Sequence, residues 1–489
     1  MTEQRHTAKI VHGMSLLVLT SVAARAIVLV AQLILGYLLS PTDFGLYALA
    51  LSISNSVWAL RNGGTAQVMI QRGLHYREGL SEVTQYSLIV NIIALVILLA
   101  VAPLAGAANK MSDIGWLIIA IGLSFPMGTF GTVFRTELSI MGRFKQLAFL
   151  NTLSVGLWQL EVVILAAFGF GAYSFAIPMV LQSIIDGVLG WLYVRRWPLR
   201  GPLIRWPEFA SLFRETRWIM LGLATMSLGL TGHYFAAGLF LDPATVGVFF
   251  FGFQLAFTFF TILNNGIDPV LPAALAHLNA EPQQQSRTTM DMLEMLMTVS
   301  LPLTGALALC APTAIHLLWH GRWDRSAGVV SITALSIPAW VGIAIVRAVL
   351  EARGMWLERL GLLAIYGIGT FVVVAAAAAT HDLTVISACL SAFYAIYSVV
   401  LLAALPALTG VPLWNVMGAF LKPLVLCVGC ALLACLSQQT LPAASSETLK
   451  GLLGALVFAL GALITNWLLF GKVWKSALAM LFGHKPRIA

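Results

Sequence analysis

The chain has 489 residues, of which 59% are hydrophobic and 10% are charged, and its formal net charge is +8. Because soluble domains carry about 25% charged residues, this composition excludes a soluble domain and indicates a protein whose solvent is lipid. We interpret the basic excess as membrane topology and contact with anionic membrane lipids, and we expect no nucleic-acid partner.

Charge-poor apolar runs, each long enough to cross the hydrocarbon of a bilayer, recur along the whole chain. They predict an all-α integral membrane protein with about 14 transmembrane helices. The first run is too long for a signal peptide and lacks a small-residue cleavage site, so we expect it to remain as a membrane anchor. The predicted helices are 14–39, 44–61, 83–103, 114–134, 147–168, 173–194, 218–240, 246–267, 290–311, 328–350, 357–379, 383–405, 414–436 and 449–470.

The lysines and arginines predict how the chain is oriented. With the N-terminus inside, about three quarters of the 28 basic residues fall on the cytoplasmic side, as the positive-inside rule expects for a correct set of helices. Both termini are therefore expected in the cytoplasm.

One cytoplasmic segment stands out as a linker. RRWPLRGPLIRWPEFASLFRETR, residues 195–217, combines three prolines with six arginines, and such a composition is typical of a connecting segment. The predicted organisation is an N-terminal six-helix lobe at 1–196, the linker at 197–216 and a C-terminal six-helix lobe at 217–408. Residues 409–489 are predicted to form two further helices and a cytoplasmic amphipathic tail.

The chain contains two similarly punctuated stretches. LSPTDFGLYALALSISNSVWALRNGG at 39–64 and LDPATVGVFFFGFQLAFTFFTILNNG at 241–266 align without a gap. Proline and glycine often begin and end helices, but here the turn, the helix start and the helix end all coincide, which favours a duplication. The identical pairs are Leu39 and Leu241, Pro41 and Pro243, Gly45 and Gly247, Asn62 and Asn264, and Gly64 and Gly266.

This duplication predicts the architecture. An even number of helices separates the copies, so they are parallel and related by a pseudo-twofold axis along the membrane normal. Two six-helix bundles related in this way enclose a cleft, and rocking of one against the other gives alternating access. Two extra C-terminal helices follow the bundles.

Three arginines are candidate substrate-binding residues. Arg25 lies near the middle of the first predicted helix, where a charged side chain is costly unless it faces a cavity or a partner. We interpret it as a donor to an anionic group of a ligand, with an ion pair to Glu161 or Asp186 as the alternative. Arg61 and Arg135 lie at the cytoplasmic ends of the second and fourth helices, where they could meet an entering head group; an arginine that snorkels to the interface is the favoured interpretation there.

Acidic and histidine residues offer candidates for ion coupling. Glu161 and Asp186 are the acidic residues placed most deeply in predicted helices, and they either bind a coupling proton or sodium ion or balance the charge of Arg25. His233 lies in the seventh helix, where its protonation could gate opening and plain packing is the alternative. Trp323, in the outer HGRWDRS loop, either anchors the chain at the interface or stacks on a sugar ring.

Two stretches suggest hinges. Gly229 and Gly232 belong to a stripe of small residues in the seventh helix, which indicates close packing or bending. Gly266 and Pro269 lie in NNGIDPVLP, where proline removes a backbone donor, so this stretch predicts a hinge or a helix end. We find no catalytic constellation, no metal site and no nucleotide-binding motif, and we expect no cofactor.

At this point a family resemblance appears. The stretch LSPTDFGLYALALSISNSVWALRNGGTAQVMIQR, residues 39–72, resembles the second-helix signature of the Wzx-type polysaccharide flippases. These belong to the multidrug/oligosaccharidyl-lipid/polysaccharide (MOP) exporter superfamily. The matching positions are Leu39, Pro41, Phe44, Gly45, Tyr47, Gly63, Gly64, Ile70, Gln71 and Arg72.

The resemblance implies a flippase and not an enzyme. Its cargo would be an undecaprenyl-pyrophosphate-linked oligosaccharide repeat unit, moved from the cytoplasmic to the periplasmic leaflet of the bacterial inner membrane. The product would serve exopolysaccharide, capsule or lipopolysaccharide O-antigen synthesis. Membrane lipids, a polysaccharide polymerase and export machinery are the partners that the resemblance implies.

Three alternatives stay open. A lipid II flippase shares the helix count but has a more arginine-rich cleft, and a multidrug:cation antiporter usually has fewer helices and an acidic cleft. A membrane oligosaccharide polymerase needs a sizeable outer loop, and the predicted outer loops are short. The sequence does not name the glycan or the coupling ion.

Overall fold

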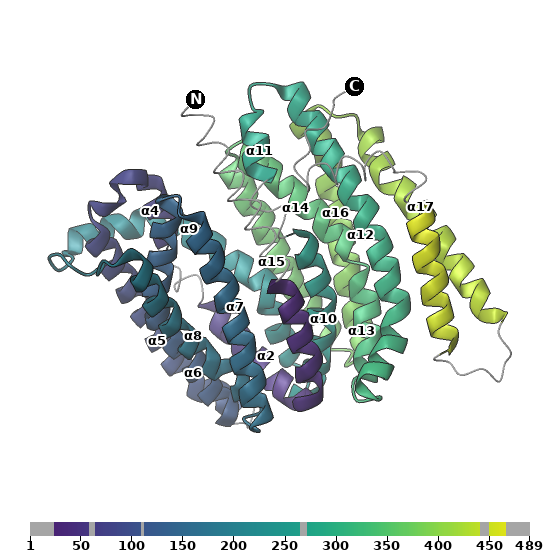
Figure 1. Ribbon diagram of the computed structural model, residues 1–489, viewed down its shortest axis with the longest axis horizontal. Helices are drawn as coiled ribbons and strands as arrows, with labels where there is room; N and C mark the ends of the chain where they lie inside the picture. Colours follow the sequence, from purple (N-terminus) through teal and green to yellow (C-terminus); the bar gives the residue numbers. More distant parts are fainter. Residues whose placement is uncertain (1–23, 58–63, 109–111, 265–270, 441–448, 466–489) are drawn as a thin grey trace. The chain divides into compact units, whose positions relative to one another are not determined.

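A computed structural model describes residues 24–57, 64–108, 112–264, 271–440 and 449–465 (Figure 1). These residues form helices and connecting turns, so the expected all-α fold is confirmed. The chain divides into two compact units. Unit 1 comprises Met1–Phe250 and Leu363–His381, and unit 2 comprises Phe251–Leu362 and Asp382–Ala489.

Unit 1 begins with the helix Ala24–Leu38 and contains most of the N-terminal helices. It ends with the first residues of α10 and most of α15. Its labelled elements are α2 (Pro41–Ser56), α4 (Thr65–Arg72), η1 (Gly73–Arg77), α5 (Leu80–Ala108), α6 (Ser112–Ile140), α7 (Phe144–Ala167), α8 (Tyr173–Val194) and α9 (Trp206–Gly238).

Unit 2 contains the C-terminal helices and ends with the helix Leu449–Thr465. Two helices, α10 (Pro243–Asn264) and α15 (Trp356–Ala378), are divided between the units. The remaining elements are α11 (Leu271–His277), α12 (Pro282–Trp319), α13 (Asp324–Ala334), α14 (Ile337–Ala352), α16 (Leu383–Thr409) and α17 (Leu413–Gln439).

Within the described residues, the predicted apolar runs fall on helices, with 328–350 divided between α13 and α14, but the count of fourteen spans is not confirmed. Ten helices are long and apolar enough to cross a membrane, and the bent pair α13–α14 makes up to 11. The first predicted helix is described only from Ala24 onward, and α2 has 16 residues. Compactness also groups α9 with the N-terminal helices, whereas the sequence placed it in the C-terminal lobe; that division into lobes stays a prediction.

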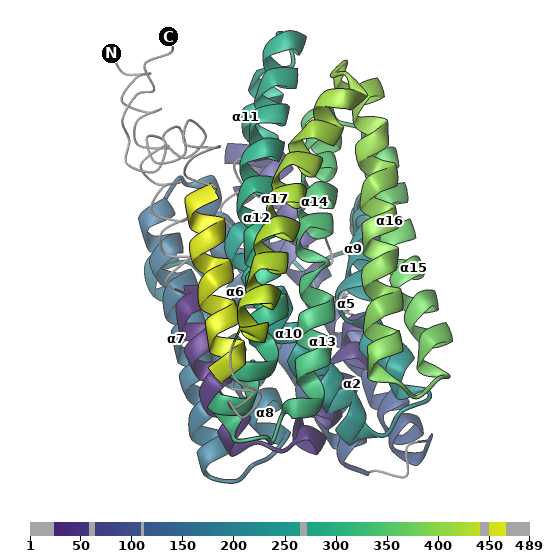
Figure 2. The ribbon, with the colours of Figure 1, turned by 90° about the vertical axis from the view of Figure 1, so that its right-hand side faces the viewer.

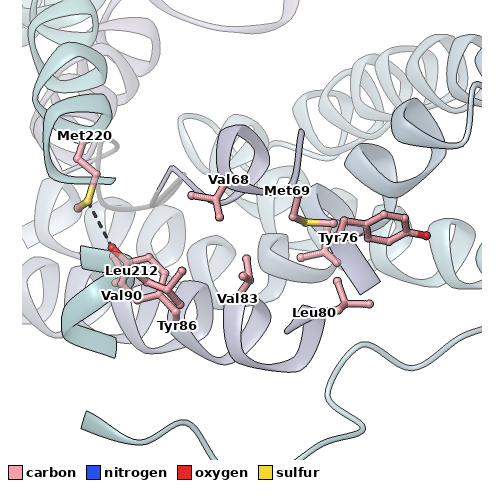
Figure 3. Close-up of a cluster of buried hydrophobic side chains, with 10 residues drawn as sticks. Val68, Met69, Tyr76, Leu80, Val83, Tyr86, Val90, Leu212 and Met220 are labelled. Atoms are coloured by element: carbon pink, nitrogen blue, oxygen red, sulfur yellow. Dashed lines mark hydrogen bonds between the residues drawn. The ribbon is translucent and has the colours of Figure 1, made fainter. Parts of the chain in front are cut away.

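The short elements α4 and η1 are joined to the longer helices of unit 1 by an apolar cluster (Figure 3). Tyr86 of α5 contributes to it, and its hydroxyl hydrogen-bonds to the Thr216 hydroxyl of α9 at 2.6 Å. Figure 3 shows the same hydroxyl directed at the Met220 sulfur. The cluster consists of Val68, Met69, Tyr76, Leu80, Val83, Tyr86, Val90, Val133, Leu212 and Met220.

In unit 2, α13 and α14 follow one another with a bend of 43° (Figure 2). The bend has a chemical cause, because Pro338 has no N–H to offer the carbonyl of Ala334, four residues earlier. The Thr304 hydroxyl of α12 donates to that carbonyl at 3.2 Å. The bend is therefore satisfied by a neighbouring helix, as a membrane interior requires.

A hydroxyl of α13 in turn satisfies a backbone carbonyl of α12. Pro312 within α12 leaves the carbonyl of Ala308 without its helical donor, and the Ser331 hydroxyl of α13 donates to it at 2.9 Å. Each helix therefore satisfies a carbonyl that proline frees in the other. This reciprocal exchange fixes α12 against α13–α14.

The two sequence repeats begin their helices in the same way. Ser40 caps α2, accepting from the Asp43 N–H while Asp43 accepts from the Ser40 N–H at 2.9 Å. At the equivalent positions of α10, Asp242 accepts from the Thr245 N–H at 3.1 Å and from its hydroxyl at 2.7 Å. The carboxylate has moved from the third helical position to the cap, and the capped turn is retained.

Within unit 1, these two first turns touch each other reciprocally. A Cβ on Gly45 would overlap the carbonyl oxygen of Pro243, and a Cβ on Gly247 would overlap that of Pro41. A contact in which each copy offers the same residues to the other is typical of a twofold relation. It also explains both glycines, because no side chain fits between the two backbones.

We predict that Gly45→Ala destabilises the protein, because its Cβ must push apart the first turns of α2 and α10. Overpacking of this kind costs about 1–3 kcal/mol, measurable as a lower thermal unfolding midpoint of the purified protein. Gly247→Ala should have the same effect. The double variant should be little less stable than either single variant, because each of the three variants separates the same two turns.

The matched control is Gly156→Ala in α7, where a Cβ would meet nothing within 4 Å. Its midpoint should stay unchanged or rise slightly, since alanine is the better helix former. Equal midpoints for Gly45→Ala and Gly156→Ala would contradict the reciprocal contact.

We predict that Thr304→Val lowers stability by about 1–3 kcal/mol, because it leaves the buried carbonyl of Ala334 without a donor. Thr304→Ser keeps the hydroxyl and should retain most of the wild-type midpoint. A valine variant as stable as the serine variant would show that the Ala334 carbonyl does not need this donor.

Candidate functional site

Three helices of unit 1 bring together an arginine, a carboxylate and several amide and hydroxyl groups. Arg135 of α6 forms an ion pair with Asp186 of α8, with 2.7 Å between guanidinium nitrogen and carboxylate oxygen. Arg135 also donates to the Asn151 side chain and, at 2.6 Å, to the Ser154 hydroxyl, both on α7. We call Arg135, Asn151, Ser154, Gln182 and Asp186 the Arg135 cluster.

A glycine lets the helices approach closely enough for this pairing. Gly131 precedes Arg135 by one helical turn, so both lie on the same face of α6. A Cβ on Gly131 would lie 2.9 Å from the Asp186 Cβ. The sequence therefore places a small residue on α6 where α8 must come near, and the ion pair forms one turn further along.

The donors of the cluster converge on a single oxygen. Asp186 Oδ1 accepts from Arg135, from the Ser154 hydroxyl at 2.6 Å and from the Gln182 amide at 2.8 Å. The side chains of Arg135 and Asp186 are 27% and 20% exposed, so both can be reached from outside the helix bundle. The charge of Arg135 is thus balanced within unit 1.

Two side-chain oxygens of the described part of the chain, one in the cluster and one on the neighbouring Glu161, accept no hydrogen bond. Among the described residues, Gln182 Oε1 and Glu161 Oε2 are buried without a hydrogen-bond partner. Glu161 follows Ser154 by two turns of α7, so both residues lie on the same face of that helix. Unused acceptors beside two carboxylates can hold a proton or a small cation.

The other candidate residues of unit 1 lie on other helices. Arg25 is half-buried on the helix Ala24–Leu38. Ser227, its equivalent in the second repeat, donates to the Asn55 carbonyl at 2.6 Å and so satisfies the end of α2. Arg61, Gly266 and Pro269 lie outside the described residues.

His233 is buried in an aromatic part of unit 1. Its ring lies 4.0 Å from the Tyr234 ring and 6.0 Å from that of Phe249, measured between centroids, and the residue is 0% exposed. Such surroundings favour the packing interpretation of His233. Gating by its protonation stays a prediction.

The two glycines of α9 lie at close contacts. A Cβ on Gly229 would lie 2.5 Å from the Tyr366 ring of α15, and one on Gly232 would lie 2.6 Å from Leu228. On the α15 side, a Cβ on Gly367 would overlap the carbonyl oxygen of Thr225. Gly229 therefore packs against α15, as small residues do between membrane helices, whereas the contact of Gly232 is with its own helix; their role as hinges stays a prediction.

The expectation for Trp323 was wrong. This residue is 0% exposed, and its ring stacks on Phe251 with 4.0 Å between centroids, within unit 2. It therefore neither anchors the chain at the interface nor offers a face to a sugar. The charged neighbours in HGRWDRS made an outward-facing side chain look natural, but Trp323 turns inward at the start of α13.

Sequence reasoning missed the most buried carboxylate of unit 1. Glu137 of α6 is 2% exposed and accepts a hydrogen bond from the Tyr76 hydroxyl of η1 at 2.7 Å. Burial raises the pKa of the Tyr76 phenol, which therefore stays a neutral donor. The sequence signal for its burial was the four-residue spacing from the apolar Val133, which places both residues on one face of α6; Val133 is 0% exposed.

We predict that Asp186→Ala lowers stability by about 1–3 kcal/mol, because Arg135 loses its counter-charge inside the bundle. Arg135→Met combined with Asp186→Leu should lose less than Asp186→Ala alone, since no uncompensated charge remains. Thermal unfolding midpoints of the purified variants measure this. A double variant less stable than Asp186→Ala would contradict the ion pair as the reason for the loss.

Comparison with known proteins places this geometry in a family. A family model described as polysaccharide biosynthesis protein matches residues 34–328, more than half of the chain. No curated protein matches the chain.

Several solved structures share the fold. The lipid II flippase MurJ in an inward closed conformation is 11% identical, with a TM-score of 0.72, covering 94% of this chain and 99% of that chain. An inward-facing multidrug resistance MATE family transporter of the MOP superfamily is 16% identical, with a TM-score of 0.62 and coverages of 81% and 94%. A MOP superfamily transporter from Pyrococcus furiosus, described as having a binding pocket of reverse polarity, is 15% identical, with a TM-score of 0.57 and coverages of 84% and 96%.

These neighbours are transporters and flippases rather than enzymes, in agreement with the expectation of no catalytic role. The protein is a multi-pass membrane protein with the fold of the MOP superfamily. The resemblance in residues 39–72 is confirmed by the family match, which contains them. The chain belongs to the polysaccharide biosynthesis protein family.

Proposed function

We propose that this protein flips an undecaprenyl-pyrophosphate-linked oligosaccharide repeat unit from the cytoplasmic to the periplasmic leaflet of a bacterial inner membrane. The family match over residues 34–328 is the observation that carries the proposal. The apolar composition and the MOP-superfamily fold support it, since a lipid-linked cargo needs a membrane-spanning carrier. Export by alternating access would then supply exopolysaccharide, capsule or O-antigen synthesis.

The cargo has an anionic pyrophosphate, and the described arginines differ in how they can serve it. Arg135 is paired with Asp186. Arg25 is half-buried near the middle of the first predicted helix, where a charged side chain usually has a function. We assign Arg25 as the main pyrophosphate donor, because a guanidinium matches phosphate oxygens with paired hydrogen bonds. Arg135 is a second donor that must first exchange Asp186 for phosphate.

That exchange suggests how transport is coupled to an ion. When phosphate takes the place of Asp186 on Arg135, the carboxylate loses its counter-charge and lies beside Glu161. Two neighbouring carboxylates favour uptake of one proton, so cargo binding and proton binding would support each other. In this scheme Glu161 and Asp186 share the proton, and His233 remains a packing residue.

The cellular setting follows from the same proposal. Both termini lie in the cytoplasm, in keeping with the predicted bias of basic residues to that side. A polysaccharide polymerase and export machinery consume the flipped product on the outer side. Their removal of product supplies a further driving force.

A lipid II flippase is the second candidate, favoured by the TM-score of 0.72 to MurJ. Lipid II and the proposed cargo share a polyprenyl pyrophosphate and differ in the sugar. Rescue of a strain depleted of its lipid II flippase would support this candidate, and failure to rescue would leave the oligosaccharide cargo.

We predict that deletion of the gene makes a lipid-linked oligosaccharide accumulate on the cytoplasmic leaflet, detected by mass spectrometry of extracted lipids and by loss of the surface polysaccharide. Restoring the wild-type gene should reverse both effects. Unchanged lipid-linked intermediates and unchanged surface polysaccharide would overturn the proposed function.

We predict that Arg25→Ala fails to restore export at a wild-type protein level in the membrane, because the pyrophosphate loses its main donor. Arg25→Lys, which keeps the charge without the paired donors, should restore export in part. Arg287→Ala, at an exposed position early in α12, is the control and should export normally. Wild-type export by Arg25→Ala would remove this residue from the mechanism.

A further inference from the structure

The predicted linker between α8 and α9 is held firmly on unit 1. The Gln85 amide of α5 donates to the Pro202 carbonyl at 2.8 Å, and its oxygen accepts from the Ile204 N–H at 2.8 Å. Trp197 stacks on Phe130 of α6, with 5.2 Å between ring centroids. The linker is therefore a fixed part of the surface of unit 1.

This fixed segment presents apolar and basic side chains together. Leu203 is 86% exposed and Trp206 is 76% exposed, with the exposed Arg200 beside them. Large apolar side chains on a segment whose backbone is fixed, and which are nevertheless exposed, indicate an interaction surface.

The first turns of α9 extend the same surface. Trp206, Phe213 and Arg217 follow one another at helical spacing on one face and are exposed, whereas Leu212 and Thr216 are buried on the other. We call the combined surface the linker patch, and it consists of Arg196, Arg200, Leu203, Trp206, Phe213, Arg214 and Arg217.

The depth of the patch is set by α5. Gln85, which holds the linker, is followed by the exposed apolar side chains of Ile89, Ile92 and Ile93. These begin one to two helical turns further on, a rise of about 6–12 Å. The headgroup layer on each side of the hydrocarbon is about 5–8 Å thick, so the patch lies level with the headgroups.

We propose that the linker patch binds anionic phospholipid headgroups of the leaflet it faces, with Leu203 and Trp206 inserted among them. Residues 195–217 carry six arginines against two glutamates, which complements an anionic surface. Side chains with an apolar body or stem and a polar end are suited to this layer. An acidic protein would also complement the charge of the arginines. The patch lies at headgroup depth, close to the exposed isoleucines of α5, and this favours lipid as the partner.

The depth of Leu203 tests the insertion directly. In a full-length background with the five cysteines replaced by serine, Leu203→Cys is labelled with a nitroxide and reconstituted into phosphatidylcholine/phosphatidylglycerol vesicles. Its collision rate should be higher with dissolved oxygen than with a water-soluble nickel chelate, as for Val96→Cys on the exposed face of α5.

The water-exposed reference is Gln283→Cys, near the start of α12. A nitroxide at position 203 that behaves like the one at position 283 would overturn the insertion. So would one shielded from both reagents by a bound protein.

The headgroup preference is tested with charge. The triple variant Arg196→Gln, Arg200→Gln, Arg214→Gln removes three arginines that are exposed on unit 1. In native mass spectrometry of the purified protein, retention of added phosphatidylglycerol should fall about fivefold per arginine removed, and retention of phosphatidylcholine should not change.

A charge-matched control removes three basic residues of unit 2, with Arg287→Gln, Arg325→Gln and Lys450→Gln. It should retain phosphatidylglycerol nearly as well as the wild type. Equal losses in the two triple variants, or none in either, would show that the patch has no special affinity and would overturn the proposal.

Discussion

Lipid offers no hydrogen-bond partners, so the backbone polar groups inside a span must be satisfied by the protein itself. The proline exchange in unit 2 follows from this constraint. Pro312 and Pro338 each remove a backbone donor, and hydroxyls of Ser331 and Thr304 replace it across the helix contact. A bend that would be costly in isolation becomes a specific link between two helices.

Charges obey the same constraint more strictly. Arg135 has its carboxylate within 2.7 Å and two further acceptors on α7. Buried ion pairs contribute little net stability compared with apolar residues of similar size, so stability alone does not explain this cluster. A charge kept inside a membrane protein in spite of its cost usually has a function, and exchange of Asp186 for a substrate phosphate is a function that this geometry allows.

Much of the fold could be predicted from the sequence, because apolar runs and helix punctuation are local signals. The capped start of α2 is one example, since Ser40, Pro41 and Asp43 specify it within four residues. Which side of a helix faces protein is another matter, because lipid and protein interior are equally apolar. Ile93 and Phe251 look alike in the sequence, yet one is 46% and the other 0% exposed.

The prediction of the site was limited for the same reason: the sequence does not show which helix faces meet. Arg135 and Asp186 could both be named from their position in apolar runs, but their pairing depends on how closely α6 and α8 approach at Gly131. Glu137 was not singled out from the sequence, and Trp323 was misjudged because its charged neighbours suggested an exposed position. Both are enclosed by partners distant in sequence, Tyr76 for one and Phe251 for the other.

Equivalent positions of the two repeats are identical in some places and different in others, and the contacts explain which. Gly45 and Gly247 stay identical because each meets the backbone of the other copy and no side chain fits. Arg25 and Ser227 occupy equivalent positions of the repeat and differ: the serine satisfies the end of α2, whereas the arginine carries a charge on the apolar helix Ala24–Leu38. The two copies therefore stay alike where their backbones touch and differ in charge at Arg25 and Ser227.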